Sequence, residues 1–209
     1  FAQAGYIVCS NASAFRLDAN VPLIIPEVNA DHLVLLERQK EAYHWKGLLV
    51  TSPNCTTTGI VLTLKPIDLA FRLKKVIAVS MQAVSGAGYP GLSYLDIQDN
   101  VIPYISGEEE KMEHESRILL GHIKEKQRID ADFILSAQAN RVPVSDGHTI
   151  CLSLELQHKA SIAEIKDILS NFRAPSFQTA LPSMPRFPVI VREEHDRPQP
   201  RKDRDAGRG

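Results

Sequence analysis

The chain has 209 residues, of which 44% are apolar and 23% are charged, and its net charge is -1. This composition is typical of a globular protein with one large domain or two small ones. A nearly neutral chain lacks the basic excess that favours nucleic acid or an anionic membrane surface. No apolar run approaches the roughly 20 residues that a membrane span needs. We therefore expect neither nucleic acid nor membrane as a partner.

Three cysteines, Cys9, Cys55 and Cys151, are widely spaced along the chain. An odd number without a CxxC pair or zinc-ligand spacing argues against a disulfide framework and against a metal site. The N-terminus lacks the basic segment and apolar core of a signal peptide. These observations favour a reducing, cytoplasmic compartment.

The first third of the chain alternates short apolar runs with polar segments. Residues 6–9 predict a short strand that ends in Ser10-Asn11-Ala12-Ser13, and polar residues at this end of a strand contact ligands in open α/β sheets. The apolar run 21–25 is interrupted by proline. Asp31 is a suitable N-cap for a helix over residues 33–44. This order indicates an α/β arrangement.

The stretch 52–59 connects an apolar run at residues 47–51 to a pattern that predicts a helix from residue 57 to residue 64. Cys55 therefore lies where a strand leads into a helix. The partial positive charge at a helix N-terminus favours thiolate over thiol, and a thiolate is the nucleophile of acyl-transfer chemistry. Most cysteines are small buried residues, so Cys55 alone does not decide between structure and catalysis.

Residues 75–84 form the clearest strand pattern, and their apolar composition predicts a buried strand. A loop of small residues, 85–88, follows it, where main-chain amides are well placed to meet a ligand. Residues 92–107 read as a loop. Glu108-Glu109-Glu110-Lys111 opens a predicted helix to about residue 122, since acidic residues suit the first turn.

Residues 133–139 predict another strand, which leads to Arg141 and His148 on either side of a turn. The alternating pattern of residues 149–156 predicts a half-buried antiparallel strand. A histidine at the start of a strand is more often structural than catalytic, but an arginine on the same hairpin adds weight to the alternative of a site for anion binding and proton transfer.

The last part of the chain begins with a predicted helix over residues 162–171, capped by Ser161. After Arg173 the chain reads as irregular, with Pro175 and three further prolines before residue 189. Residues 189–191 are a candidate strand, and residues 197–201 read as extended.

Several motifs together resemble those of the aspartate-semialdehyde dehydrogenase family, in the branch found in archaea and fungi. The resemblance runs over nearly the whole chain, and the motifs agree in order and spacing. The matching segments are 10–16, 21–29, Pro53-Asn54-Cys55-Thr56, 82–88, 108–111 and 141–148.

The resemblance implies a role for each of the main polar residues. Cys55 is expected to form a thiohemiacetal and then a thioester with the substrate, and His148 to act as general base and acid. Gln82 would orient the substrate at the cysteine. Arg141 would bind the substrate carboxylate, and Glu108 its amino group.

The remaining implied contacts concern phosphate and cofactor. Lys111 and Arg16 would bind phosphate, and Asn54, beside the nucleophile, belongs to the substrate site. The residues expected near the nicotinamide are Asn11, Ser85 and Gly86.

The resemblance also implies the fold and domain organisation. It predicts an α/β (α+β) protein in which residues 1–54 form the C-terminal part of an NADP-binding Rossmann-type domain. Residues 55–209 would form a glyceraldehyde-3-phosphate-dehydrogenase-like catalytic and dimerisation domain, with a mixed or antiparallel sheet and flanking helices.

The implied activity is the NADP-dependent, reversible reduction of L-4-aspartyl phosphate to L-aspartate 4-semialdehyde. This reaction serves the biosynthesis of lysine, methionine and threonine, with diaminopimelate on the lysine branch. The family consists of cytoplasmic homodimers or homotetramers.

Two other readings remain open. The first is another enzyme of the same superfamily. Malonyl-CoA reductase resembles this branch closely, and N-acetyl-glutamyl-phosphate reductase shares the chemistry with poorer motif agreement. Glu108 and Lys111 favour the aspartyl substrate.

The second reading is a fragment without activity. The family's glycine-rich nucleotide-binding turn would precede Phe1, and its C-terminal helix would follow Gly209. We therefore expect an internal fragment that binds NADP weakly, and an inactive fragment is the second alternative.

Overall fold

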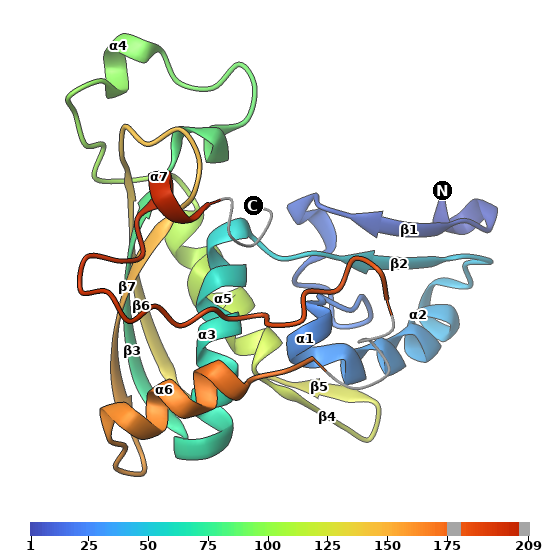
Figure 1. Cartoon of the computed structure of the whole chain (residues 1–209). Helices are drawn as coiled ribbons and strands as arrows, with labels where there is room; N and C mark the ends of the chain where they lie inside the picture. Colours follow the sequence, from blue (N-terminus) through green and yellow to red (C-terminus); the bar gives the residue numbers. More distant parts are fainter. Residues whose placement is uncertain (175–180, 205–209) are drawn as a thin grey trace.

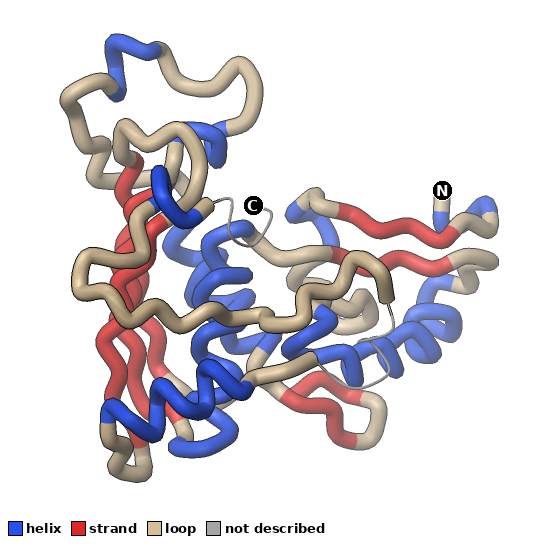
Figure 2. Tube along the Cα trace, in the orientation of Figure 1, coloured by secondary structure: helices blue, strands red, loops and turns tan. Residues whose placement is uncertain are grey.

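The structure is a computed structural model that describes residues 1–174 and 181–204. Helices and strands alternate in its first part (Figures 1 and 2). Up to the nucleophile these are η1 (Ala2–Ala4), β1 (Ile7–Ser10), η2 (Ser13–Phe15), α1 (Pro26–Asn29), η3 (Ala30–Val34), α2 (Leu35–Tyr43) and β2 (Leu48–Thr51).

The second part contains longer elements and a larger sheet. These are α3 (Cys55–Phe71), β3 (Leu73–Gln82), η4 (Val84–Ala87), α4 (Tyr94–Ile97), α5 (Glu108–Leu119), β4 (His122–Lys124), β5 (Gln127–Ile129), β6 (Ile134–Arg141), β7 (Thr149–Leu156), α6 (Ile162–Asn171) and α7 (Pro200–Asp203).

The first part is built on a parallel pair of strands, β1 and β2, which run side by side in Figure 1. Both predicted strands are confirmed, and the predicted helix 33–44 appears as η3 followed by α2. The apolar run 21–25 forms no strand, because Pro22 has no N–H to donate, and only Leu23 bridges Thr51. The C-terminal ends of β1 and β2 bring residues 10–16 next to residues 52–54.

Helix α3 begins at Cys55 and is longer than the pattern predicted, because it continues through Pro66 to Phe71. Its buried stripe, Ile60, Leu64 and Ile67, packs in the main core. This burial extends past the proline and outweighs the hydrogen bond that the proline removes. The core also includes Leu23, Ile25 and Val28 from the first part of the chain.

The central sheet has the order β6-β3-β7, with β3 parallel to β6 and antiparallel to β7. Helices α3, α5 and α6 lie on one side of it (Figure 1). The prediction that residues 75–84 are buried is therefore only half right. Val76 and Ala78 are fully buried, whereas Ile77 between them is 48% exposed. The half-buried antiparallel strand predicted over residues 149–156 is confirmed as β7.

A hairpin that the sequence pattern did not predict follows α5, which ends at Leu119. Strands β4 and β5 have three residues each and join through Glu125 and Lys126, both with positive φ. Such turns usually contain glycine or asparagine, so the sequence carried no hairpin signal. The hairpin packs on the first part of the chain, where Lys126 pairs with Glu37 at 2.7 Å.

The C-terminal segment differs from two expectations. Residues 189–191 form no strand, because none of the sheets in the described part of the chain includes them as a pairing partner. Residues 197–201 are not wholly extended, because α7 begins at Pro200. The predicted irregular position Pro175 lies outside the described residues. α7 returns to the turn before His148, where Pro200 lies beside Gly147.

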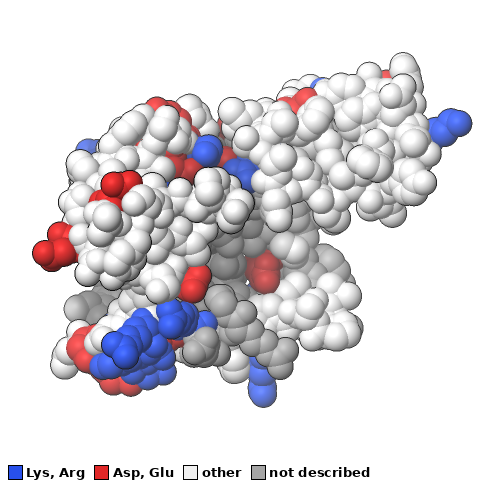
Figure 3. All heavy atoms as spheres, turned by 90° about the horizontal axis from the view of Figure 1, so that it is seen from above, with Lys and Arg blue, Asp and Glu red and all other residues white. Residues whose placement is uncertain are grey.

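On the upper face of the molecule, basic and acidic side chains gather in a large cluster at the lower left of Figure 3, and a smaller group of both signs lies nearer the upper middle. The segment around α7 contains such mixed pairs: Arg197 pairs with Asp203, and Lys202 with Asp196 at 3.3 Å. Within residues 1–174 and 181–204, no helix is both long and apolar enough to cross a membrane.

Candidate active site

Cys55 is the first residue of α3 and its side chain is exposed. The preceding residue, Asn54, caps the helix: its Oδ1 accepts hydrogen bonds from the N–H groups of Thr56 at 2.9 Å and Thr57 at 3.1 Å. Asparagine is among the preferred N-cap residues because its side chain satisfies these otherwise unpaired donors. The sulfur therefore lies at the positive end of the helix dipole, as the sequence predicted.

His148 is the partner of this cysteine, with Sγ and Nε2 separated by 3.2 Å. The main-chain N–H of Ala83 donates to Nδ1 at 3.0 Å. Because Nδ1 accepts this bond, a neutral ring carries its proton on Nε2, which then donates toward the sulfur. Burial lowers the pKa of His148 below its ordinary value, and the nearby Arg141 guanidinium lowers it further, so the ring stays neutral.

The hairpin before β7 holds His148 in this position. Val142 N–H donates to the carbonyl of Gln82 at 3.0 Å, and the N–H of Val84 donates to the carbonyl of Val144 at 2.8 Å. These bonds extend the β3–β6 pairing past the strand ends. They hold the turn against the residues after β3 and so place the histidine beside Ala83.

Glu108, at the start of α5, is the centre of a second group of predicted residues. Its Oε1 pairs with Lys111 at 2.8 Å, and its Oε2 accepts from Asn54 Nδ2 at 2.8 Å and from Gln82 Nε2 at 3.4 Å. Burial alone would raise the pKa of Glu108, but the hydrogen bonds from Lys111 and Asn54 outweigh it and lower the pKa. Glu108 is therefore ionised and pairs with the lysine.

Arg141 lies at the end of β6, opposite Gln82 in the strand register, and is 5% exposed. Its Nη1 donates to the carbonyl of Ala83 at 2.7 Å. Gly86 comes so close that a Cβ there would be 2.8 Å from Arg141 Nη1 and 3.0 Å from His148 Cε1. Only glycine fits this approach without displacing one of the two side chains.

Arg16 is buried and joins the first part of the chain to α5. Its Nη1 donates to Glu115 at 3.0 Å, and its Nη2 to the carbonyl of Asn11 at 2.7 Å. The other carboxylate oxygen of Glu115 accepts the main-chain N–H of Asn54 at 2.6 Å. Glu115 was not among the site residues predicted from the sequence. The available signal was its place on the buried stripe of α5, one turn after Met112.

The residues expected near a nicotinamide lie on two sides of the nucleophile. The side-chain oxygen of Asn11 contacts the hydroxyl of Ser52. Ser85 and Gly86 are exposed on η4, with Gly86 next to His148. Hydrogen bonds thus connect Asn11 to the turn before Cys55, and Ser85 to the histidine hairpin through the carbonyl of Ser145 at 3.1 Å.

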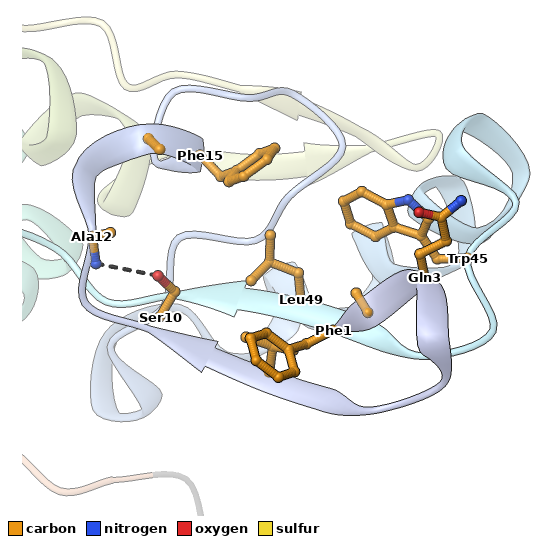
Figure 4. A pocket seen from close by; sticks show the side chains of 10 residues that line it. Phe1, Gln3, Ser10, Ala12, Phe15, Trp45 and Leu49 are labelled. Carbon is orange, nitrogen blue, oxygen red and sulfur yellow. Dashed lines mark hydrogen bonds between the residues drawn. The ribbon is translucent and has the colours of Figure 1, made fainter.

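A cavity of about 350 Å³ lies on the β1–β2 side (Figure 4). Phe1, Phe15, Trp45 and Leu49 line it with small residues, and none of its lining side chains is charged. The cavity includes none of the predicted catalytic residues. In the described part of the chain, no group of three or more His, Cys, Asp or Glu residues is arranged to hold a metal ion.

Two family models match the chain. The dimerisation domain of semialdehyde dehydrogenase matches residues 64–208, which is more than half of the chain. The NAD-binding domain of semialdehyde dehydrogenase matches residues 1–36.

Curated relatives carry the name aspartate-semialdehyde dehydrogenase. The protein of Archaeoglobus fulgidus is 51% identical over 210 residues, and that of Cryptococcus neoformans is 41% identical over 218 residues. Each alignment covers 100% of this chain but 60% of the relative. The chain thus spans about 60% of the length of these relatives.

Solved structures agree with this result. Aspartate semialdehyde dehydrogenase from Candida albicans, crystallised with NADP, has a TM-score of 0.89 and 36% identity, covering 99% of this chain and 60% of that one. Aspartate semialdehyde dehydrogenase II from Vibrio cholerae, complexed with ASA, has a TM-score of 0.68 and 26% identity, covering 82% and 55%. The mixed α/β fold and the resemblance drawn from the motifs are confirmed. The chain belongs to the semialdehyde dehydrogenase family.

Proposed function

We propose that this chain carries the acyl-transfer site of an enzyme that reduces L-4-aspartyl phosphate to L-aspartate 4-semialdehyde with NADPH. The observation that carries the proposal is the pair of Cys55 and His148, 3.2 Å apart at the start of α3. The names of the archaeal and fungal relatives support it.

Four charged side chains, Arg141, Glu108, Lys111 and Arg16, suit the charged groups of aspartyl phosphate. The Arg141 guanidinium suits the α-carboxylate, since it offers donors in a planar fork. The ionised Glu108 suits the α-ammonium group. Lys111, paired with Glu108 at 2.8 Å, suits the phosphate together with Arg16. Gln82 and Asn54, both bonded to Glu108, keep this carboxylate in place.

The first chemical step is the transfer of the acyl group to sulfur. The Cys55 thiolate attacks the carbonyl carbon of aspartyl phosphate and a carbon–sulfur bond forms. The bond from that carbon to the phosphate oxygen breaks, and inorganic phosphate leaves with the electron pair. His148 holds a proton at Nε2 beside the sulfur, so its N–H stabilises the thiolate before attack. Because Nδ1 already accepts the Ala83 N–H, we propose this donor role for His148 in place of the general-base role that the resemblance implied.

The second step needs a nicotinamide close to the thioester. Gly86 has no side chain beside the His148 ring, and Ser85 next to it is exposed, so a planar nicotinamide ring fits against them. Asn11 would meet the nicotinamide from the side of Ser52. When bound, NADPH supplies the hydride that reduces the thioester carbon to the aldehyde level. Cys55 then leaves as thiolate, and the Nε2–H of His148 again stabilises it.

Malonyl-CoA reduction by the same cysteine is the alternative, and the Glu108–Lys111 pair favours the aspartyl substrate over it. The deciding experiment supplies the chain with NADPH and either aspartyl phosphate or malonyl-CoA. We expect aldehyde formation and a Cys55 thioester with aspartyl phosphate only. Turnover of malonyl-CoA alone would show that the chain belongs to a malonyl-CoA reductase and overturn the proposal. A failure with both donors would favour an inactive fragment.

We also propose that a second copy of the chain packs on the open face of the central sheet. This face presents Ile77 and Ile134, which are 48% and 62% exposed, among small polar residues such as Ser136 and Ser153. The match to a dimerisation domain supports the proposal. Sedimentation should show a dimer or tetramer that Ile77→Lys dissociates and that Leu95→Lys, at an exposed position of α4, leaves intact.

The same proposal places the enzyme in the reducing cytoplasm, in the biosynthesis of lysine, methionine and threonine. The exposed and unpaired state of Cys9, Cys55 and Cys151 supports a reducing compartment.

A further inference from the structure

Glu115 is a buried carboxylate that no motif of the sequence analysis included. It is 2% exposed and lies on α5, two turns after Glu108. Its two oxygens bind different partners: Oε1 accepts from Arg16 at 3.0 Å, and Oε2 accepts from the main-chain N–H of Asn54 at 2.6 Å. A buried carboxylate bonded this closely to one main-chain amide restricts where that amide can lie.

The bond to Asn54 completes the cap of the nucleophile's helix. In a capping box, a Glu or Gln at the third helical position accepts the N–H of the N-cap residue. In α3 that position is Thr57, whose own N–H already donates to Asn54 Oδ1. Glu115 supplies the missing carboxylate from another helix. Asn54 is thereby held at its main chain by Glu115 and at its side chain by Glu108.

Glu115 also connects the nucleophile to the other side of the site. Its partner Arg16 donates to the carbonyl of Asn11, whose side chain contacts Ser52, two residues before Asn54. The loop after β1 and the turn before Cys55 are thus tied together around this carboxylate.

Other glutamates of α5 provide a comparison. Glu109 and Glu113 accept the N–H groups of Ala139 at 3.0 Å and Ala137 at 3.1 Å, along the free edge of β6. They make the same kind of bond as Glu115, a side-chain carboxylate to a main-chain N–H of another element. They do not touch the turn before Cys55, so Glu113 is a matched control.

We propose that Glu115 is a positioning residue for acyl transfer: through Asn54 it holds Cys55 in the geometry that attacks the acyl donor. This inference rests on the proposed function. Replacing Glu115 with Gln keeps the size of the side chain but turns one acceptor oxygen into a donor. The remaining oxygen stays with the Arg16 guanidinium, because the charge-assisted hydrogen bond is the stronger of the two, and the N–H of Asn54 loses its acceptor.

The test compares two reactions of Cys55 in Glu115→Gln and in Glu113→Gln. Acylation by aspartyl phosphate depends on alignment, and we expect its saturating rate to fall by about 10- to 100-fold in Glu115→Gln. Alkylation of Cys55 by iodoacetamide depends on little but exposure, so it should stay near the wild-type rate. Glu113→Gln should change neither reaction.

Each outcome bears on the inference. Equal acylation rates in wild type and Glu115→Gln would overturn it, and so would an equal loss in Glu113→Gln. If wild type itself takes no acyl group, the proposed function fails instead. If Glu115→Gln does not fold, the double variant Arg16→Met/Glu115→Met removes both buried charges and both acceptor oxygens. Wild-type protection of its Asn54 amide against hydrogen exchange would then contradict the inference, and lost protection would support it.

Discussion

The two sides of the nucleophile are built differently. On the α5 side, Asn54, Gln82, Glu108, Glu115 and Arg141 are all buried and hydrogen-bonded to one another or to main chain. On the β1–β2 side, Tyr6 is 63% and Ile7 77% exposed, and the cavity of Figure 4 is lined by uncharged side chains. The difference teaches that the groups proposed for acyl transfer are held in place by hydrogen bonds, whereas the side that matches an NAD-binding domain presents mainly apolar surface.

Cys55→Ala is the substitution expected to have the largest effect. Without the sulfur no thioester forms, so phosphate release from aspartyl phosphate should disappear while the fold is retained. Cys151→Ala, which removes another exposed thiol from the open face of β7, should leave the rate unchanged. Residual acylation in Cys55→Ala would show that the α5 side does not work through this cysteine.

Gly86→Ala should have the next largest effect. Its Cβ would come within 2.8 Å of Arg141 Nη1 and 3.0 Å of the His148 ring, so one of these side chains must move. Because a displacement of about 1 Å can cost about 100-fold in rate, we expect a loss of this order in acylation. The thermal midpoint should change little. A normal acylation rate would mean that neither side chain has to stay where it lies.

The residues of the site differ in how far the sequence could reveal them. The roles expected of Cys55, His148 and Glu108 came from the resemblance to the family, whereas the hydrogen bonds from Glu108 to Asn54, Gln82 and Lys111 became visible only in the structure. Ala83 and Glu115 left no trace in the motifs: one acts through a main-chain N–H, and the other reaches Asn54 from 61 residues away. The open face of β3 was also missed, since apolar composition does not tell a core from an unpaired face.

The pH dependence of stability should be a smaller effect. Burial is the main cause that lowers the pKa of both His148 and the fully buried His32, so each binds its proton more readily when unfolded. The stability that these two histidines contribute in their neutral form should therefore be fully present above about pH 6.5. It should be lost as the pH falls below this value, so that the free energy of unfolding decreases.

His32→Gln tests this prediction in urea titrations at about pH 7 and about pH 5. In the variant, the free energy of unfolding should depend less steeply on pH. The slope should fall by no more than about 1.4 kcal/mol per pH unit, which is the limit for a single proton. An unchanged slope would show that His32 does not stay neutral in the folded chain. An exposed histidine, His158, serves as the control in His158→Gln.

NADPH should have the smallest effect on the acylation step. The side chains that line the cavity beside β1 and β2 are uncharged and cannot pair with the phosphates of NADPH, so we expect a dissociation constant of about 1 mM or weaker. Fluorescence titration measures this directly. Adding NADPH should leave the rate of phosphate release nearly unchanged, because the residues on the α5 side are already hydrogen-bonded in place without a bound nucleotide. Tight binding, or acylation that requires NADPH, would remove the contrast between the two sides.

The most direct test of the account is a count of the phosphate released when the chain meets aspartyl phosphate without any nucleotide. The account predicts a rapid burst that approaches one phosphate per chain, with one aspartyl group on Cys55 and none on Cys9 or Cys151. No burst, or acyl groups spread over the three cysteines, would contradict the claim that the acyl-transfer site is complete on the α5 side.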